Sequence, residues 1–284
     1  MSMPGVMRTR LARAGVVLSL SMAVLAATAA PATAKAPRAH ASVIGGRVAS
    51  LSEWGFAASL ATPHTLCTGV VIAPTKVLTA AHCAISLPSL VVRTNSTSAF
   101  GGGEVSGVSS AAIAPGFSHG FENDVAVLTL GTPTTATPIQ LATPAEDATY
   151  SQAGAPLAVA GFGNRNPILG RQKIGLLTAA EVRVRRCALP GWAICDSGGR
   201  AGAVLRQIHH RWRKRKVKKT ICSGDSGGPL VARTPSGPRL VGIAEASSGP
   251  RKPNPFFFVI CGLKGFPSLH TNLSGYLPFI LGSG

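Results

Sequence analysis

Residues 222–230 read Cys-Ser-Gly-Asp-Ser-Gly-Gly-Pro-Leu. Small residues on both sides of Ser226 allow a sharp turn, and such a turn can direct backbone N–H groups at a bound substrate. A serine hydroxyl alone is a weak nucleophile at neutral pH, so Ser226 needs a base and a group that orients this base. The stretch therefore predicts nucleophilic catalysis, provided that both partners occur elsewhere in the chain.

Two upstream segments supply these partners. They read Thr79-Ala80-Ala81-His82-Cys83 and Asn123-Asp124-Val125-Ala126-Val127-Leu128. Taken singly, each residue has an ordinary explanation: a structural histidine, a surface carboxylate or helix cap, and a glycine-rich turn. Together, in the order His, Asp, Ser, the three segments resemble the trypsin/chymotrypsin family of serine proteases. The resemblance extends from about Val43 to the C-terminus.

The resemblance implies an all-β fold of two six-stranded antiparallel barrels, with the active site in the cleft between them. The chain itself also favours many short strands, because apolar runs recur between glycines and prolines. A Thr- and Pro-rich stretch, 132–144, is the expected boundary between the barrels, and residues 273–280 favour a short terminal helix. The apolar runs are Val70–Ala73, Lys76–Ala81, Leu90–Arg93, Val125–Leu130, Leu157–Ala160, Leu230–Ala232 and Leu240–Ala244.

The same resemblance gives each residue of the site a role. His82 is the general base, and Asp124 holds the imidazole in the useful tautomer. Ser226 forms the acyl-enzyme. The backbone N–H groups of Gly224 and Ser226 bind the oxyanion that develops on the scissile carbonyl.

The resemblance also implies an activation step. Val43-Ile44-Gly45-Gly46 is similar to the mature start of family members, whose new terminal ammonium pairs with the residue that corresponds to Asp225. Ser42 stands where many relatives have Arg or Lys, which argues against a trypsin-like activating cut. Cleavage by signal peptidase after Ala41 would leave only Ser42 to trim. We expect a mature chain that begins at Val43.

The first 42 residues have the pattern of targeting and processing sequence. A start with three arginines precedes an apolar stretch over 15–30, which is short for a membrane span. Ala32-Thr33-Ala34 is the better cleavage site and Ala39-His40-Ala41 the second; a short membrane anchor is the alternative. We therefore expect a secreted, extracellular protein. Its expected parts are a signal peptide over 1–34, a propeptide over 35–42 and a peptidase domain over 43–284.

Six cysteines follow this leader, and an even number in an exported chain argues for three disulfides. Spacing alone cannot choose among the pairings. No C-x-x-C motif or His/Cys cluster supports a metal site, so neither a metal nor another cofactor is expected. The family resemblance implies the pairs Cys67–Cys83, Cys187–Cys195 and Cys222–Cys261.

The substrate pocket departs from the trypsin pattern. Thr220 aligns with the pocket floor, where trypsin-like relatives have an aspartate. Ser247 and Ser268 align with the walls, where the widest pockets have glycine. Without a buried anion, a Lys or Arg side chain would be desolvated without a partner, which is costly. We predict a preference for small or medium uncharged residues before the scissile bond.

Glu245 is a second departure, because relatives usually have a serine there that hydrogen-bonds the triad aspartate. A second carboxylate would repel Asp124 and raise the pKa of one of the two groups. Alternatively, Glu245 turns outward into the cleft and contacts the substrate. The sequence leaves both interpretations open.

The strong positive charge is local. Beyond residue 42 lie 23 of the 28 Lys and Arg and all 10 acidic residues, and eight of these cations fall in Arg206–Lys219. This stretch lies in an insertion between Cys195 and Cys222. It is either a solvated loop or a surface for a polyanion such as nucleic acid, a heparin-like glycan or anionic lipid. A second insertion, Pro250–Ile260, contains three consecutive phenylalanines.

The sequence thus favours a secreted, monomeric serine endopeptidase without a stable membrane anchor. Its expected partners are polypeptide substrates and protein inhibitors. The alternative is a protease-like polyanion-binding protein with weak or no catalytic activity. A third interpretation, an esterase for small acyl esters, shares the chemistry but not the substrate.

Overall fold

The computed structural model describes residues 43–85, 87–118, 120, 122–166, 173–186, 193–198, 200–208, 211–247, 261 and 267–283. In 197–198, 200–208, 211–217 and 246–247 it describes the backbone alone. The expected signal peptide and propeptide, Cys187 and the Pro250–Ile260 insertion lie outside the described residues.

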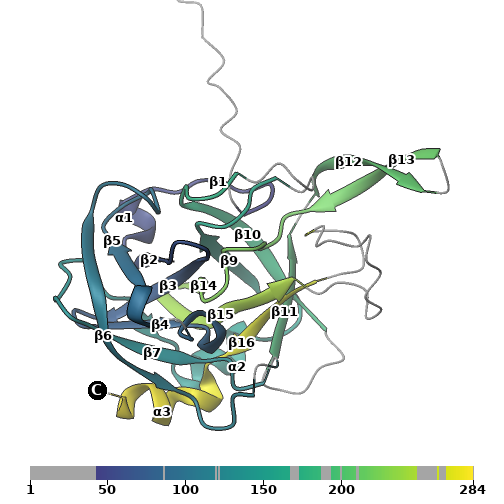
Figure 1. Cartoon of the computed structure of the whole chain (residues 1–284). Coiled ribbons are helices and arrows are strands. Elements are labelled where there is room, and N and C mark those ends of the chain that lie inside the picture. The colour runs from purple at the N-terminus through teal and green to yellow at the C-terminus, as the bar shows by residue number, and fades with distance from the viewer. Residues whose placement is uncertain are drawn as a thin grey trace, which may run out of the picture. The chain divides into compact units, whose positions relative to one another are not determined.

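A closed barrel of six strands forms the first half of the described chain (Figure 1). All of its neighbouring strands are antiparallel. Val, Leu and Ala fill its interior, as expected for strands with a buried face. Around the barrel the strands are β2 (Ala57–Ala61), β3 (Leu66–Ala73), β4 (Lys76–Thr79), β7 (Ala126–Leu130), β6 (Glu104–Ile113) and β5 (Val91–Thr94).

A second ring of six strands follows and closes because β9 pairs with both β14 and β10. The ring consists of β9 (Pro156–Gly161), β10 (Thr178–Arg185), β11 (Ala193–Gly198), β16 (Ser268–Asn272), β15 (Gly237–Ser247) and β14 (Pro229–Thr234). Two short strands extend this sheet: β1 (Arg47–Val48) pairs with β10, and β8 (Gln140–Leu141) pairs in parallel with β15. The predicted fold of two six-stranded antiparallel barrels is confirmed.

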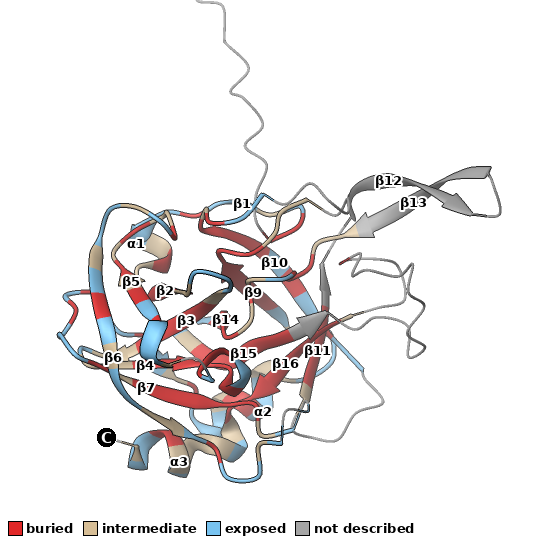
Figure 2. Cartoon of the chain, viewed as in Figure 1, coloured by how far each residue is buried: buried red, intermediate tan, exposed pale blue. Residues whose placement is uncertain are grey.

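The two barrels share part of their core. One buried cluster combines Val70 and Leu78 of the first barrel with Ala160 and Leu240 of the second. Trp54, which is 1% exposed, joins the same cluster. Figure 2 shows this burial along the strands of both barrels. Contacts of this kind hold the barrels in one unit and fix the position of loops that meet between them.

Short helices connect and follow the barrels. They are α1 (Leu51–Trp54), α2 (Pro144–Tyr150), α3 (Leu277–Gly282) and the 3-10 turns η1 (Ala81–Cys83), η2 (Leu87–Ser89) and η3 (Ser274–Tyr276). The predicted terminal helix is present as α3. No helix among the described residues is both long and apolar enough to cross a membrane.

The expected boundary segment, 132–144, follows β7, contains β8 and ends at the start of α2. The sequence analysis did not predict α2. Its first turn has a capping box, in which Thr143 and Glu146 exchange side-chain to backbone hydrogen bonds.

Most of the basic stretch is strand. β12 (Arg200–Ile208) and β13 (Arg211–Lys218) form a separate antiparallel pair, in which Arg206 lies opposite Arg213. The interpretation of Arg206–Lys219 as an irregular solvated loop is therefore replaced by a β-hairpin.

Candidate active site

Strand pairing brings His82 and Asp124 together. Thr79 at the end of β4 lies opposite Ala126 at the start of β7, so the residues just beyond these two positions meet. His82 follows in η1, and Asp124 precedes β7. The His82 backbone N–H donates to Asp124 Oδ1 at 2.8 Å, and Nδ1 lies 2.6 Å from Asp124 Oδ2.

The two members of this pair differ in exposure. The Asp124 side chain is 1% exposed, whereas that of His82 is 39% exposed. Asn123 supports the turn: its φ is +58°, and its Oδ1 accepts a hydrogen bond from the Tyr276 hydroxyl at 3.0 Å. The carboxylate thus fixes one ring nitrogen and leaves an edge of the imidazole accessible.

Ser226 lies in a loop that is fastened to both barrels. Its carbonyl accepts a hydrogen bond from the Thr68 N–H at 2.8 Å, and the next amide, Gly227, donates to the Ala244 carbonyl at 2.6 Å. Gly227 has a φ of +77°, and a Cβ there would lie 2.3 Å from the Thr68 carbonyl oxygen. Only glycine fits this position, which sets the sharp turn at the serine.

The Ser226 hydroxyl donates to the Glu245 carbonyl at 3.2 Å. For His82 to accept this proton, Ser226 Oγ must leave the Glu245 carbonyl. In serine hydrolases without substrate, the hydrogen bond between nucleophile and base is often long or absent, and it forms when substrate binds.

The predicted oxyanion donors are available. In the part of the chain that the structure describes, neither the Gly224 N–H nor the Ser226 N–H donates to a protein acceptor. Gly224 has a φ of +94°, and a Cβ there would lie 2.8 Å from Gly163 Cα. One donor belongs to the nucleophile's own residue and the other lies two residues before it, so both are available for the proposed oxyanion.

Asp225 is completely buried and is held by backbone alone. Its carboxylate accepts hydrogen bonds from the N–H groups of Gly163 and Cys222, each at 2.8 Å. Burial raises its pKa to about 7. The backbone N–H of Val43 donates to Thr178 Oγ1 at 2.7 Å, so the expected ion pair between Val43 and Asp225 is not formed in this uncleaved chain.

The predicted pocket residues lie together. Thr220 Oγ1 and Ser268 Oγ form a hydrogen bond of 2.6 Å, and both residues are buried. Ser247 pairs in register with Ser268. This hydroxyl pair carries no charge. It would therefore provide no counter-ion for a substrate Lys or Arg side chain at this point.

Glu245 is buried rather than open to the cleft, with 4% exposure. Thr271 Oγ1 donates to its Oε2 at 3.4 Å, and its Oε1 has no hydrogen-bond partner among the described residues. Burial raises its pKa to about 8, and the negative charge of Asp124 adds to this shift. Glu245 therefore keeps its proton at neutral pH.

A second His–Asp pair was missed in the sequence. His270 Nε2 lies 2.6 Å from Asp196 Oδ2, and both side chains are 0% exposed. Asp196 Oδ1 and His270 Nδ1 make no further hydrogen bond within the described chain. No motif joins these residues; only the pairing of β11 with β16, in which Asp196 lies opposite Ser268, brings them together.

Two of the implied disulfides are present, Cys67–Cys83 and Cys222–Cys261. Cys195 is also disulfide-bonded, and its expected partner Cys187 is outside the described residues. The ligand atoms of Cys67, His82 and Cys83 lie within 4.8 Å of one another. This trio does not fit a metal ion, because its two sulfur atoms are bonded to each other.

Comparison with known proteins gives consistent matches. A family model described as Trypsin matches residues 43–263. Trypsin of Saccharopolyspora erythraea is 29% identical over 84% of this chain and 96% of that protein. Serine protease 56 of Homo sapiens is 29% identical over 86% of this chain, which spans only 39% of that longer protein. Phenoloxidase-activating factor 3 of Holotrichia diomphalia is 27% identical over 84% of this chain and 71% of that protein.

Proposed function

Since the chain belongs to the trypsin family of serine proteases, we propose that it is a secreted serine endopeptidase that acts through an acyl-enzyme. The observation that carries this proposal is the contact of 2.6 Å between His82 and Asp124 beside an anchored Ser226. A fully buried pair would serve structure, whereas in this pair the His82 side chain is 39% exposed.

The chemistry proceeds in two halves. His82 takes the Ser226 proton as Oγ attacks the scissile carbonyl, and the N–H groups of Gly224 and Ser226 bind the oxyanion. His82 then protonates the leaving amine, and the carbonyl remains as an ester of Ser226. Water activated by His82 hydrolyses this ester. Asp124 stabilises the imidazolium in both halves.

Activation is proposed to create a new terminus at Val43. Asp225 is buried with two backbone N–H donors and no cationic side chain from the described residues. A terminal ammonium beside it would supply the missing positive charge and favour the ionised carboxylate.

The specificity pocket is proposed to take small or medium uncharged side chains before the scissile bond. The hydroxyl pair of Thr220 and Ser268 is the support for this proposal. Asp196, the buried acid opposite Ser268 in the sheet, is already bonded to His270. Cleavage of a peptide library that is dominated by Arg or Lys would contradict it.

A second function has support from one observation, the arginine- and lysine-rich β-hairpin of β12 and β13. The strand pairing fixes the backbone of a stretch rich in Arg and Lys, and a dense run of cations suits a polyanion. The chain would then be a protease-like binding protein. Salt-sensitive retention on heparin or DNA, lost on deletion of 206–219, is the expected result for this alternative.

The decisive experiment uses protein that begins at Val43. A fluorophosphonate probe should label it, and Ser226→Ala should abolish labelling. An absence of labelling in correctly processed, folded protein would contradict the endopeptidase and favour the binding protein. N-terminal sequencing of active material that finds another start would contradict the proposed activation.

A further inference from the structure

Glu245 occupies a β-bulge next to the nucleophile. In the antiparallel pairing of β15 with β16, Ala244 lies opposite His270, and Ala246 lies opposite Leu269. Since the two partners on β16 are consecutive, Glu245 is the extra residue of the bulge. A bulge bends its strand and re-aims the side chain at this position. The result here is a glutamate that is buried between the two barrels' contributions to the site.

The main chain at this bulge is fastened to the loop that carries the nucleophile. The Gly227 N–H donates to the Ala244 carbonyl at 2.6 Å, and the Ala244 N–H donates to the Gly228 carbonyl at 2.7 Å. The next carbonyl, that of Glu245, accepts the Ser226 hydroxyl at 3.2 Å. A displacement of Glu245 is therefore passed directly to the turn at Ser226.

The side chain of the same residue lies within range of the triad aspartate proposed above. Asp124 is buried, and its negative charge adds to the effect of burial on the pKa of Glu245. The Thr271 hydroxyl donates to Oε2 at 3.4 Å, and Oε1 has no partner among the described residues. Glu245 is thus bonded to the proposed nucleophile through its main chain and exposed to the charge of Asp124 through its side chain.

The elements around Glu245 offer it no positive charge in the described part of the chain. No Lys or Arg among these residues forms an ion pair with Glu245 or Asp124. His270 lies on the other face of β16 from Thr271. The ionisable groups on these elements have partners of their own, which are Tyr276 with Asn123, Asp225 with the N–H groups of Gly163 and Cys222, His82 with Asp124, and His270 with Asp196.

We propose that Glu245 is a positioning residue for the site, and that it supports catalysis only while its carboxyl group keeps its proton. The inference rests on the proposed endopeptidase function and adds a reversible alkaline limit to it. When base removes the proton, two carboxylates share a buried region without an ion-paired cation from the described residues. Like charges repel strongly in such a region, and a buried carboxylate without a partner is costly.

The repulsion drives the Glu245 carboxylate toward water, and the bulge moves with it. The hydrogen bonds of Ala244 with Gly227 and Gly228 carry this movement into the turn after Ser226. Oγ is then misaligned with its base and with the scissile carbonyl, which slows the attack. The carboxyl proton passes to hydroxide and forms water. No bond of Ser226 or of the substrate breaks, so a return to neutral pH restores the site.

The pH profile of kcat in protein that begins at Val43 tests the inference. The ratio of kcat in the parent to kcat in Glu245→Gln should fall about 10-fold between pH 7 and 9, because the parent group has a pKa of about 8 and the amide cannot ionise. The Val43 ammonium and Asp225 titrate in both proteins and cancel in this ratio. Glu122→Gln is the matched control, since it removes an exposed carboxylate two residues before Asp124, and its profile should follow the parent.

Infrared spectroscopy supplies a readout that does not depend on activity. In a Ser226→Ala background, which prevents self-digestion, the difference spectrum between proteins with and without Glu245→Gln should contain a carboxylic-acid band. This band should disappear with a midpoint at a pH of about 8. A band that is already absent at pH 6 would overturn the inference.

The kinetic outcomes separate this inference from the proposed function. A kcat ratio that stays constant from pH 7 to 9 overturns the role of Glu245 and leaves the endopeptidase intact. A folded Glu245→Gln that is inactive at pH 7 also overturns this role, because the amide copies the uncharged carboxyl group. If Glu245→Gln does not fold, Glu245→Ala serves, since it cannot ionise either. A parent that hydrolyses no peptide at any pH overturns both proposals.

Discussion

Among the described residues, the two barrels each contain one histidine–aspartate pair. His82 and Asp124 belong to the first barrel, and His270 and Asp196 to the second. The nitrogen–oxygen distance is 2.6 Å in both pairs, and both aspartates are buried. The histidines differ: His82 is 39% exposed and His270 is 0% exposed.

This difference shows that the contact itself does not make a catalytic site. Asp124 also accepts the His82 backbone N–H, so it orients both the ring and the chain that carries it. The second pair lacks a serine on an anchored turn and an open ring edge. Under the proposed mechanism, the same two residue types serve proton transfer in one barrel and internal packing in the other.

The largest expected effect separates the pairs by activity. Asp124→Asn should lower kcat by about 10⁴-fold, because His82 then loses the tautomer that accepts the serine proton. Asp196→Asn should leave kcat per folded molecule within about 3-fold, since in the described chain that pair makes no hydrogen bond to the proposed triad. Active-site titration with hydrolysis of a peptide ester measures both. Equal losses in the two variants would contradict the division of roles.

The next effect separates the pairs by stability. Asp196→Ala leaves His270 buried without its partner and should lower the free energy of unfolding by about 3–5 kcal/mol. The double variant Asp196→Leu, His270→Phe should lose much less, since no polar group remains unpaired. Urea unfolding in a Ser226→Ala background, which prevents self-digestion, measures both. A single variant as stable as its parent would contradict the structural role.

The raised pKa of Glu245, which lies close enough to Asp124 to feel its charge, predicts that the stability of the fold depends on pH. Its folded pKa of about 8 exceeds the ordinary value of 4.5, so the unfolded chain releases this proton first as the pH rises. The free energy of unfolding therefore falls with rising pH, by about 2–3 kcal/mol between pH 5 and 7. Glu245→Gln should remove this part of the slope.

Asp225, whose pKa is also raised, adds the same pH dependence to the stability of the parent and of Glu245→Gln. The difference between the two slopes of unfolding free energy against pH therefore reports on Glu245 alone. At pH 5 the two proteins should be about equally stable, since Glu245 is then protonated in the fold. Identical slopes from pH 5 to 7 would show that Glu245 does not hold its proton at neutral pH.

The smallest expected loss of stability concerns Thr271, whose side chain lies on the face of β16 opposite to that of His270. Thr271 donates to Glu245 over 3.4 Å, which is long for a hydrogen bond. Thr271→Val should therefore cost less than about 1 kcal/mol at pH 5, far below the loss in Asp196→Ala. The same urea series measures it. A loss above about 2 kcal/mol would indicate that this face matters as much as the His270 face.

Much of the fold and the contact between His82 and Asp124 could be predicted from the sequence, because both rest on local patterns. Each of the seven apolar runs overlaps a strand, and the segments around His82, Asp124 and Ser226 are specific in order and flanks. The capping box at Thr143 and Glu146 was visible as well. It was overlooked because the surrounding prolines and threonines were interpreted as a linker.

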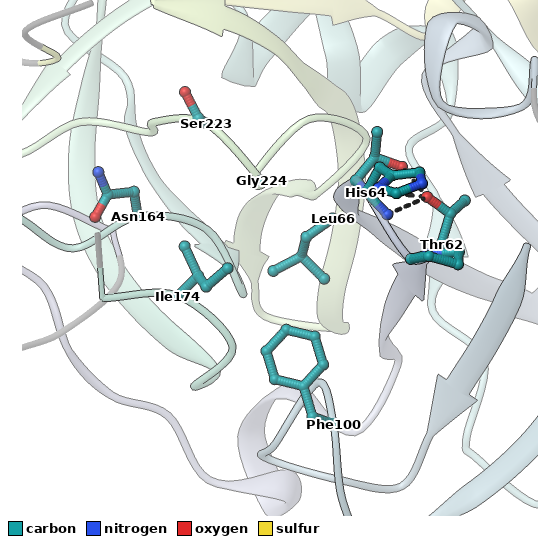
Figure 3. A pocket seen from close by; sticks show the side chains of 10 residues that line it. Thr62, His64, Leu66, Phe100, Asn164, Ile174, Ser223 and Gly224 are labelled. Carbon is teal, nitrogen blue, oxygen red and sulfur yellow. Dashed lines mark hydrogen bonds between the residues drawn. The ribbon is translucent and has the colours of Figure 1, made fainter. Parts of the chain in front are cut away.

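The remainder depends on contacts between distant strands. His270 and Asp196 are separated by more than seventy residues and meet only because β11 pairs with β16. Phe100 and Ile174 line one apolar hollow beside the Ser223–Gly224 turn (Figure 3), and the short pairing of Ser98 with Leu176 brings their segments together. No local pattern encodes such partners, so neither the second His–Asp pair nor the apolar hollow could be found from one sequence.

Under the proposed activation at Val43, the burial of this residue couples the timing of maturation to folding. Val43 is 0% exposed, its carbonyl accepts a hydrogen bond from Gly46, and Ile44 is bonded to Thr220. A processing protease must draw several residues after the cut into its own cleft, and here the first two of them, Val43 and Ile44, are buried. Cleavage of the folded chain then proceeds at a rate set by the fraction of molecules in which this segment has detached. Conditions that tighten the fold would slow the release of mature enzyme, whatever the supply of the processing protease.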